Sequence, residues 1–541
     1  MKRSIYGLFG SGLAVLFCAV AAAAAEPVPV LDFDFSKSVN GIVKDGAQSG
    51  LSLKLGPDAK IEDGALILNP SGGSFAAADQ AAFKAWAKKL NTREIAASFW
   101  IRFDKSLFGG LSNAGTASLG LFDCSLDKDG HIAVTIFPKK TEFIKPVVMK
   151  SLLTAEPGKW YHVEFAYSMN ERRYKLYIDG KFQMENDELI IPVPDIRELK
   201  LGNGFRGAVR SLKFYDAALP SEELALSDAS DADYDSLREK AAKTAAAAKN
   251  PDLKNWASSL AARAAAYKVD KSTTIAAYKR LVKAVDNAAV VADGIADPAK
   301  AVADKPVTAY VTPVTTQALY LPYDLPENGK LTNKLNIVMA QDEFESASVI
   351  VFPFKPVKNF TLRMGDLKCG NSVLKGSDAE IKIVKRWFRT GGAWMAYHVD
   401  LFMRVLTPDL LLNDDKTIRV DEFRRTNQML MHYPGGDKYQ EVSDYRYERF
   451  WLDGVLREFF YDAPTLQPLD LTEAGRNQQY IITFRAPKGT APGFYKGKLE
   501  MLADGKDAGS LDVTLRVLPY ELPVARTYYN TDKLYVSHIN R

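Results

Sequence analysis

The chain has 541 residues, which at roughly 100–200 residues per domain predicts about three domains. Its hydrophobic (47%), aromatic (11%) and charged (25%) fractions exclude a disordered chain, a collagen-like fibre and a polytopic membrane protein. The formal net charge of +4 is too balanced for the clustered basic surface that nucleic-acid binding needs, so no nucleic-acid partner is predicted.

The first 25 residues have the pattern of a secretory signal peptide. Lys2 and Arg3 precede an apolar run at 8–20, and small residues at 23–25 form a cleavage site. Cys18 raises the alternative of a lipoprotein, but the Phe17 before it is larger than lipid attachment usually allows. Because no later run of about 18 apolar residues follows, we expect an exported periplasmic or extracellular protein without stable membrane insertion.

Cysteine and histidine give no support for a metal centre. Only Cys124 and Cys369 follow the signal segment, which excludes a disulfide framework and a four-thiolate zinc site. The five histidines are scattered, without a metal-ligand spacing. The carboxylates of Asp32, Asp34 and Asp45 are possible calcium ligands, but no ligand loop of defined spacing contains them, and strand-end or turn roles are preferred. No cofactor is predicted.

Residues 26–225 alternate apolar and polar side chains with a period of two, as in the strands at 95–103, 161–167 and 174–178. Asp-Gly pairs at 63–64, 129–130 and 179–180 supply residues that tolerate the positive φ of hairpin turns. The pattern predicts an antiparallel β-sandwich.

Three segments of this region, in order, resemble laminin-G-like, concanavalin-A-like jelly rolls. IAASFWIRF (95–103) resembles the strand leading to a core tryptophan, and KWYHVEFAYSMNERRYKLYIDGKF (159–182) the W-x-H-V…Y-x-D-G strand pair. KLGNGFRGAVRSLKFYDAALPSEEL (200–224) resembles the closing segment. The resemblance implies a jelly roll in which these motifs fill and turn the sheets rather than perform chemistry.

Residues 226–303 are rich in Ala, Lys and Arg and carry apolar residues at helical spacing. Asn250 before Pro251 predicts one helix start, and Ser272 predicts another. Acidic residues lie among the lysines, so we interpret the two or three expected antiparallel helices as a spacer rather than as a nucleic-acid or membrane helix.

Strands return in residues 304–525, at 334–354, 360–369, 381–388, 479–487, 493–505 and 510–523. Asp504-Gly505 predicts a hairpin turn. Residues 390–470 carry no clean period and are expected to form long loops and short helices over one face. The fold class is therefore mainly β, with two antiparallel β-sandwich (jelly-roll) domains joined by a short α-helical module.

The second β region resembles the N-terminal sandwich of proteins related to glycoside hydrolase family 123. The segments that carry the resemblance are EFESASV (343–349), KRWFRTGGAW (385–394), LTPDLLLNDDKTIRVD (406–421), APKGTAPGFYKGKL (486–499) and VLPYELP (517–523). In that family an adjacent Asp-Glu pair in the following barrel is catalytic, so the resemblance implies an accessory, non-catalytic part of a hexosaminidase-like enzyme. Residues 526–541 are too few for a barrel of about 250 residues, which favours a fragment of a longer gene product.

No catalytic residues are assigned. The acidic pairs Asp342-Glu343, Asp414-Asp415 and Asp421-Glu422 are interpreted as turn and surface carboxylates, and no glycoside hydrolysis by this chain alone is expected.

The candidate carbohydrate-binding residues are Trp387, Arg389, Trp394 and Tyr397, because aromatic rings stack on sugar C–H faces beside hydrogen-bond donors. Core or loop-anchoring roles are the alternative. The expected partner is a polysaccharide or glycan. Two other functions stay open, a stand-alone glycan-binding or adhesion protein and a purely architectural protein.

Overall fold

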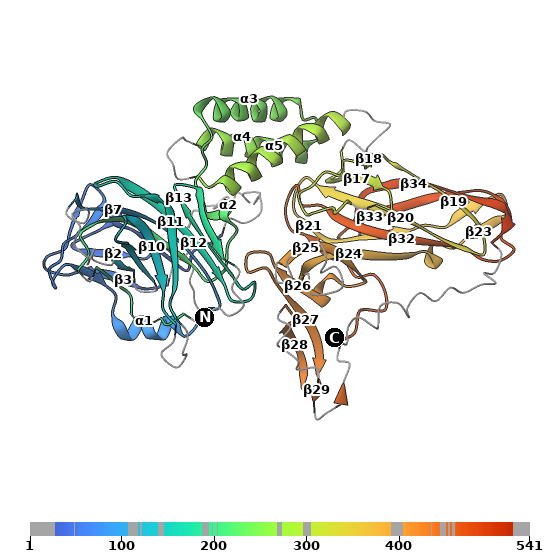
Figure 1. Ribbon diagram of the computed structural model, residues 1–541. Helices are drawn as coiled ribbons and strands as arrows, with labels where there is room; N and C mark the ends of the chain where they lie inside the picture. Colours follow the sequence, from blue (N-terminus) through green and yellow to red (C-terminus); the bar gives the residue numbers. More distant parts are fainter. Residues whose placement is uncertain are drawn as a thin grey trace, which may run out of the picture.

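The computed structural model shows two β-sandwiches with a helical module above the junction between them (Figure 1). It describes residues 27–522 with gaps, and nothing is said below of the omitted residues. The gaps are 48, 106–116, 120–121, 139–144, 187–193, 197, 203, 268–272, 296–303, 317, 391–403, 434, 444–450, 453–454 and 457–459. The mainly β fold class predicted from the sequence is confirmed.

The first sandwich consists of two facing sheets of eight strands. One sheet, called here the β7 sheet, has the order β14 (Lys181–Asn186), β13 (Arg173–Ile178), β12 (Trp160–Ser168), β7 (Glu94–Phe103), β16 (Gly207–Tyr215), β5 (Ala65–Leu68) and β4 (Lys60–Glu62), with β1 (Leu31–Asp34) also paired to β16. The other sheet has the order β11 (Val147–Thr154), β10 (His131–Ile136), β9 (Asp123–Leu126), β8 (Ala117–Leu119), β15 (Lys200–Gly202), β6 (Phe75–Ala77), β3 (Ser52–Leu55) and β2 (Ile42–Lys44). A short helix, α1 (Gln80–Ala87), packs on the core through Phe83.

Alternation of side chains builds the core between these sheets. In β7, Phe99, Ile101 and Phe103 are fully buried, whereas Trp100 between them is partly exposed. Successive strand residues point to opposite faces, so the apolar set of each strand meets that of the facing sheet. The hairpin between β13 and β14 turns at Asp179 and Gly180, whose φ angles of 51° and 73° are both positive, as the Asp-Gly pair predicts.

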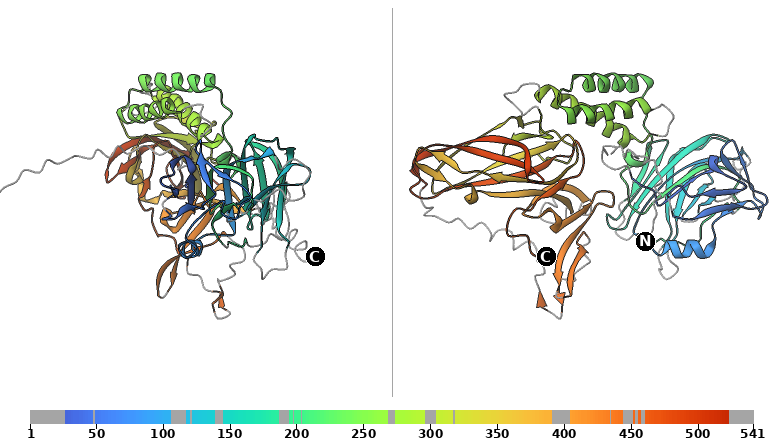
Figure 2. Two further views of the ribbon diagram at one scale, coloured as in Figure 1. Left: turned by 90° about the vertical axis from the view of Figure 1, so that its left-hand side faces the viewer. Right: turned by 180° about the vertical axis from the view of Figure 1, so that it is seen from behind.

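The helical module contains α3 (Asp231–Ala247), α4 (Pro251–Ala266) and α5 (Ile275–Ile295), preceded by the single turn α2 (Ser221–Leu224) (Figure 2). Asn250 caps α4 as predicted, because its side chain accepts a hydrogen bond from the Leu253 amide at 2.9 Å. Ser272 lies outside the described residues, and Thr274 accepts the Ala277 amide at the start of α5. The apolar faces of α4 and α5 pack on Ile350, Phe352 and Phe354 of the second sandwich.

The second sandwich pairs a six-stranded sheet with a seven-stranded one. The first has the order β18 (Lys330–Leu331), β17 (Val307–Thr312), β20 (Glu343–Pro353), β32 (Gln478–Ala486), β24 (Glu380–Thr390) and β25 (Arg404–Leu412). The second has the order β19 (Lys334–Gln341), β34 (Lys506–Glu521), β33 (Gly493–Ala503), β21 (Val357–Met364) and β31 (Leu469–Leu471). In addition, β22 (Leu367–Cys369) pairs with β33, and β23 (Ser372–Leu374) pairs with β22.

Two details of this sandwich differ from the sequence prediction. The apolar run at 334–354 is two strands in different sheets, because Asp342 takes a φ of 60° and turns the chain between β19 and β20. β19 also pairs with β34 in parallel, whereas the other described strand pairs of this sandwich are antiparallel.

The prediction of loops and short helices for 390–470 is wrong in most of the described part. β25 extends the six-stranded sheet, and a separate three-stranded sheet follows, made of β26 (Ile418–Asp421), β27 (Thr426–Tyr433) and β28 (Gly436–Glu441). A two-stranded hairpin, β29 (Trp451–Leu452) with β30 (Val455–Leu456), lies beyond them. Few of the side chains in this small sheet are buried, so the backbone ladder forms without an apolar period in the sequence.

Three arginines of the second sandwich bind acidic residues of the first. Arg404 and Glu94 form an ion pair of 3.2 Å in which each side chain is only 3% exposed. Arg425 binds Glu171 at 2.7 Å, and Arg424 binds Asp216 at 3.0 Å. Phe423 packs beside them on an apolar cluster around Ala96, Tyr215 and Leu219. These contacts hold the small sheet of β26–β28 against the first sandwich.

None of the helices in the described part of the chain has the length and apolar character needed to cross a membrane.

Candidate functional site

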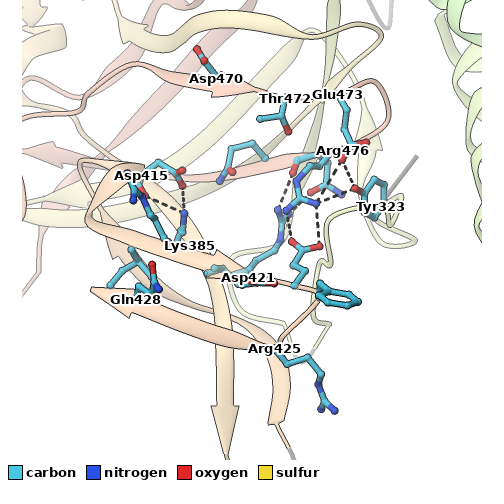
Figure 3. Close-up of a pocket in the computed structure, with 18 of the residues that line it drawn as sticks. Tyr323, Lys385, Asp415, Asp421, Arg425, Gln428, Asp470, Thr472, Glu473 and Arg476 are labelled. Atoms are coloured by element: carbon cyan, nitrogen blue, oxygen red, sulfur yellow. Dashed lines mark hydrogen bonds and ion pairs between the residues drawn. The ribbon is translucent and has the colours of Figure 1, made fainter. Parts of the chain in front are cut away.

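A cleft of about 1020 Å³ lies where the two sandwiches, the helical module and the small sheet meet. Figure 3 shows the part of its lining contributed by the second sandwich and the small sheet. β24 supplies Lys385 and Arg386, the loop between β31 and β32 supplies Glu473 and Arg476, and residues 219–223 close the side formed by the first sandwich. The cleft therefore exists only when these separate parts of the chain are folded together.

Arg476 organises one wall of the cleft. Its guanidinium donates to both carboxylate oxygens of Glu422 and, at 3.0 Å, to the hydroxyl of Tyr323. The Tyr323 hydroxyl in turn donates to Glu473 (Figure 3). Burial opposes the charged form of Arg476, but its hydrogen bond to Glu422 and the carboxylate charge raise its pKa further above the usual range. This wall holds a fixed positive charge between two carboxylates.

One carboxylate oxygen of Glu473 has no hydrogen-bond partner. Its side chain is 13% exposed, and burial raises the pKa of its carboxyl, although the bond from Tyr323 and the charge of Arg476 lower it in part. One oxygen, Oε1, accepts from Tyr323, while Oε2 is buried and has no hydrogen-bond partner. A buried acceptor without a partner costs about 1–3 kcal/mol. Because Oε2 is also buried from solvent, a ligand hydroxyl reaches it only if neighbouring side chains move.

The floor of the cleft carries Arg386, whose guanidinium donates to the Tyr320 carbonyl at 2.7 Å and to the carbonyl and side-chain oxygens of Asn477. Burial lowers the pKa of Arg386 to about 9, which leaves it charged at pH 7. Beside it, Lys385 binds Asp415 at 2.7 Å (Figure 3). Both cations are held by the protein itself.

The small sheet covers this floor and adds an aromatic ring. Arg419 stacks on Tyr439 with 3.5 Å between the guanidinium carbon and the ring centroid, and the Tyr439 hydroxyl donates to the Lys416 carbonyl at 2.6 Å. Both residues line the cleft, together with Gln428.

A second ion pair, between α2 and α5, lines the cleft and also leaves polar atoms without hydrogen-bond partners. Glu223 and Arg280 bind each other at 2.5 Å, and their side chains are 18% and 20% exposed. Glu223 Oε2 and Arg280 Nη2 are buried without a hydrogen-bond partner. Together with Glu473 Oε2, the residues that line the cleft therefore include two acceptors and one donor that the chain leaves without partners, but all three atoms are buried from solvent. This combination of donors, acceptors and aromatic rings suits a polyhydroxylated ligand.

Two of the four carbohydrate-binding residues predicted from sequence, Trp387 and Arg389, lie outside the cleft. Trp387 Nε1 donates to Asp409 at 3.1 Å, and Arg389 binds the other oxygen of Asp409 at 3.2 Å. The structure therefore brings Trp387 and Arg389 together at the β24–β25 hairpin, but neither lines the cleft. Trp394 and Tyr397 lie outside the described residues.

The acidic residues singled out in the sequence take structural contacts. Asp414 accepts the Lys416 amide at 2.9 Å, Asp421 binds Arg424 at 3.0 Å, and Glu343 accepts the Ala340 amide. Asp45 accepts the Asp32 and Ser49 amides at 2.6 and 2.7 Å, which is a turn role. In the described part of the chain, no group of three or more His, Cys, Asp or Glu residues is placed to hold a metal ion.

The face of the β7 sheet that points away from the core carries a row of polar side chains, Ser98, His162 and Glu164. Ser98 Oγ lies 2.8 Å from His162 Nε2, and His162 Nδ1 lies 2.5 Å from Glu164, whose side chain is fully buried. Burial raises the pKa of Glu164 above its ordinary value of 4.5, although the neighbouring His162 lowers it in part. The row has the order of a hydrolytic triad, but all three residues lie within paired strands, and the observed contacts supply no oxyanion site.

This raised pKa predicts a pH dependence of stability. Because the folded state binds the Glu164 proton more tightly than the unfolded state, its contribution is fully present below pH 4.5 and is lost as pH rises through the folded-state pKa. We therefore expect the stability of Glu164→Gln, relative to the native chain, to increase with pH. Urea denaturation between pH 4 and 8 measures this, with the exposed Glu62→Gln as the charge-matched control. A difference that stays flat or decreases with pH would contradict the expectation.

The comparisons with known proteins place the first sandwich in a structural class. Residues 75–225 match the family model of the concanavalin A-like lectin/glucanases superfamily, so this sandwich has the fold named for sugar-binding lectins and glucan-hydrolysing enzymes. A search of curated proteins found no significant match.

Several solved structures are similar over parts of the chain. A family 123 glycoside hydrolase from Clostridium perfringens is 16% identical, with a TM-score of 0.23, and the alignment covers 40% of this chain and 28% of that one. Domain 4 of a family 43 extracellular arabinanase from Geobacillus stearothermophilus, in complex with arabinotriose, is 14% identical (TM-score 0.27; 37% and 97% covered). A carbohydrate-binding module of a Ruminococcus gnavus sialidase, bound to sialyllactose, is 13% identical (TM-score 0.20; 26% and 84% covered).

Sequence reasoning missed the cleft because its residues come from eight separated segments. Glu422 was identified only as a member of an acidic pair, and its partner Arg476 lies 54 positions further along the chain. No local signal marks Glu473, Tyr323 or Arg280.

Proposed function

We propose that this chain is an exported, non-catalytic, carbohydrate-binding part of a glycoside hydrolase-like protein, and that the cleft is its principal glycan site. It is built from a concanavalin-A-like sandwich (26–225), a helical spacer (226–303) and a second sandwich of the type that precedes a catalytic barrel (304–525). The observation that carries the proposal is the cleft itself, which is lined by charged, amide and aromatic side chains and lies beside a sandwich of the lectin/glucanase class.

The polar groups of the cleft favour a neutral sugar ligand. Sugar hydroxyls both donate and accept, so they suit a lining that mixes carboxylates and guanidinium groups with the amides of Gln428, Asn477 and Gln478. Tyr439 lines the cleft, and the ring face opposite Arg419 is the one we propose to stack on the C–H face of a sugar. Lys385 and Arg476 are already held by carboxylates, and the seven basic side chains of the lining are nearly balanced by six acidic ones, which favours a neutral ligand over a strongly anionic one.

Trp387 and Arg389 remain proposed glycan contacts outside the cleft. Asp409 fixes both side chains, which leaves them preorganised at the β24–β25 hairpin. A chain that binds through both places would hold an extended polysaccharide at two points.

The test is a panel of neutral polysaccharides and acetylated amino-sugar oligomers, with retention of the purified chain in affinity gels as the measurement. We expect at least one to be bound, and Glu473→Gln to weaken binding by about tenfold or more, because a hydrogen bond to a charged acceptor is worth about 1.5–3 kcal/mol. Glu500→Gln is the matched control, since Glu500 is an arginine-paired carboxylate on the second sandwich that does not line the cleft.

Two results would contradict the proposal. Absence of binding across the whole panel would refute glycan recognition. Turnover of a chromogenic glycoside by the purified chain, lost in Glu473→Gln, would replace a binding role with a catalytic one, since burial raises the pKa of Glu473 as a proton donor requires.

A further inference from the structure

Two arginines lie beside a tryptophan on the β7 sheet of the first sandwich, on the face that points away from the core. Trp160 of β12 pairs with Arg102 of β7, and the Arg102 guanidinium carbon lies 5.1 Å from the Trp160 ring centroid. Arg210 of β16 approaches the same ring at 4.5 Å. Three neighbouring strands therefore bring two guanidinium groups to one indole.

Within the described residues, neither Arg102 nor Arg210 has a carboxylate partner. Arg210 is exposed, and Arg102 and Trp160 are partly exposed. The face of an indole attracts a cation, but it does not neutralise one, and two like charges held beside one ring repel each other. An anion between the guanidinium groups would relieve this repulsion and accept their paired N–H donors.

The pair lies away from the cleft and from the contact between the sandwiches. Glu94, which binds Arg404 of the second sandwich, is at the start of β7, and Arg102 is close to its end. Register pairs Glu94 with Ser168 and Arg102 with Trp160, so the two places are at opposite ends of the β7–β12 ladder. A ligand at the arginine pair would therefore leave the cleft free.

We propose that Arg102, Trp160 and Arg210 form a second glycan site that binds an acidic polysaccharide through its carboxylate or sulfate groups. The inference shares with the proposed function the premise that the chain binds glycans, but it assigns a different place and a different ligand class. Both guanidinium groups lie beside the Trp160 ring, and their forked N–H donors bind the anionic group.

The experiment compares polymers that differ only in charge. Polygalacturonate is set against its fully methyl-esterified form, and a sulfated galactan against its desulfated form, with affinity electrophoresis of the full chain as the measurement. We expect tighter binding to at least one acidic member, weakened by added salt, and the relative response to carboxylate and sulfate identifies the anionic group.

Variants locate the site. Arg102→Gln and Arg210→Gln should each weaken binding to the acidic polymer by about tenfold, with no change for the neutral polymer. Arg516→Gln is the matched control, because Arg516 is an exposed arginine 5.6 Å from the Phe494 ring on the other sandwich. Glu473→Gln should leave acidic binding intact, which separates a failure here from a failure of the cleft.

Equal affinity for the acidic and neutral members of both pairs would overturn the proposal. So would an equal loss in Arg516→Gln, which would indicate a general charge effect. Tighter binding to a single-stranded oligonucleotide of the same charge would assign the arginine pair to nucleic acid instead.

Discussion

Replacement of Arg404 by alanine should weaken the contact between the two sandwiches by about 3–5 kcal/mol, because it leaves the buried Glu94 carboxylate without its charge partner. Glu94 then keeps only its neutral bonds, to Ser168 at 3.2 Å and Asn170 at 2.9 Å. Arg404 also donates to the Arg425 carbonyl at 3.3 Å, so the Arg404→Ala variant loses this hydrogen bond to the turn between β26 and β27 as well.

Native-state hydrogen exchange measures this loss directly, since it reports the free energy of local opening for amides in β25 and at the Glu94 end of β7. Arg363→Ala is the control, because its ion pair with Glu500 is 66% exposed on the arginine side and should be worth about 1 kcal/mol or less. Glu94→Gln combined with Arg404→Met should recover much of the loss, since no buried charge then lacks its partner. An Arg404→Ala effect no larger than that of Arg363→Ala would show that the pair does not hold the sandwiches together.

Replacement of Trp256 by alanine should destabilise the helical module and the second sandwich together, by about 3–5 kcal/mol. Trp256 lies in α4, is 5% exposed, and its ring is 5.9 Å from that of Phe352 in β20. Gly475 packs beneath it with a φ of 79°, and a Cβ there would approach the indole to 2.7 Å. Gly475→Ala should therefore be destabilising as well.

Chemical denaturation followed by far-ultraviolet circular dichroism measures this loss. Trp86→Ala, which removes a partly buried tryptophan from α1 of the first sandwich, is the control and should cost less. Because Gly475 precedes Arg476 directly, Trp256→Ala should also lower the affinity of the cleft for its glycan. A loss of less than about 1 kcal/mol in the free energy of unfolding would show that the helical module and the second sandwich do not stabilise each other through Trp256.

Much of the fold could be predicted because it depends on local patterns. Alternation located β7, β12 and β13, and the Asp-Gly pairs at 179–180 and 504–505 turn hairpins with two positive φ angles each. The small sheet of β26–β28 was missed because its strands bury few side chains. The division of 334–354 into two strands depends on the positive φ of Asp342, and the pattern of apolar residues gives no sign of that backbone conformation.

The candidate site could not be predicted in the same way, because it is made by long-range charge pairing. Arg476 binds Glu422, Lys385 binds Asp415, and Glu473 accepts from Tyr323, 150 positions earlier in the chain. A sequence shows the charges but not which of them meet. The aromatic residues predicted to bind sugar could be picked out from their residue type alone, whereas the cleft depends on which distant segments fold together.

The most direct test of the central claim, that the cleft binds a glycan, is calorimetric titration of the chain with the neutral oligosaccharide that the panel identifies. We predict one cleft site per chain, an affinity about tenfold or more weaker in Glu473→Gln, and an unchanged affinity in Glu500→Gln. Equal affinities for the native chain and Glu473→Gln would place the ligand elsewhere and contradict the claim.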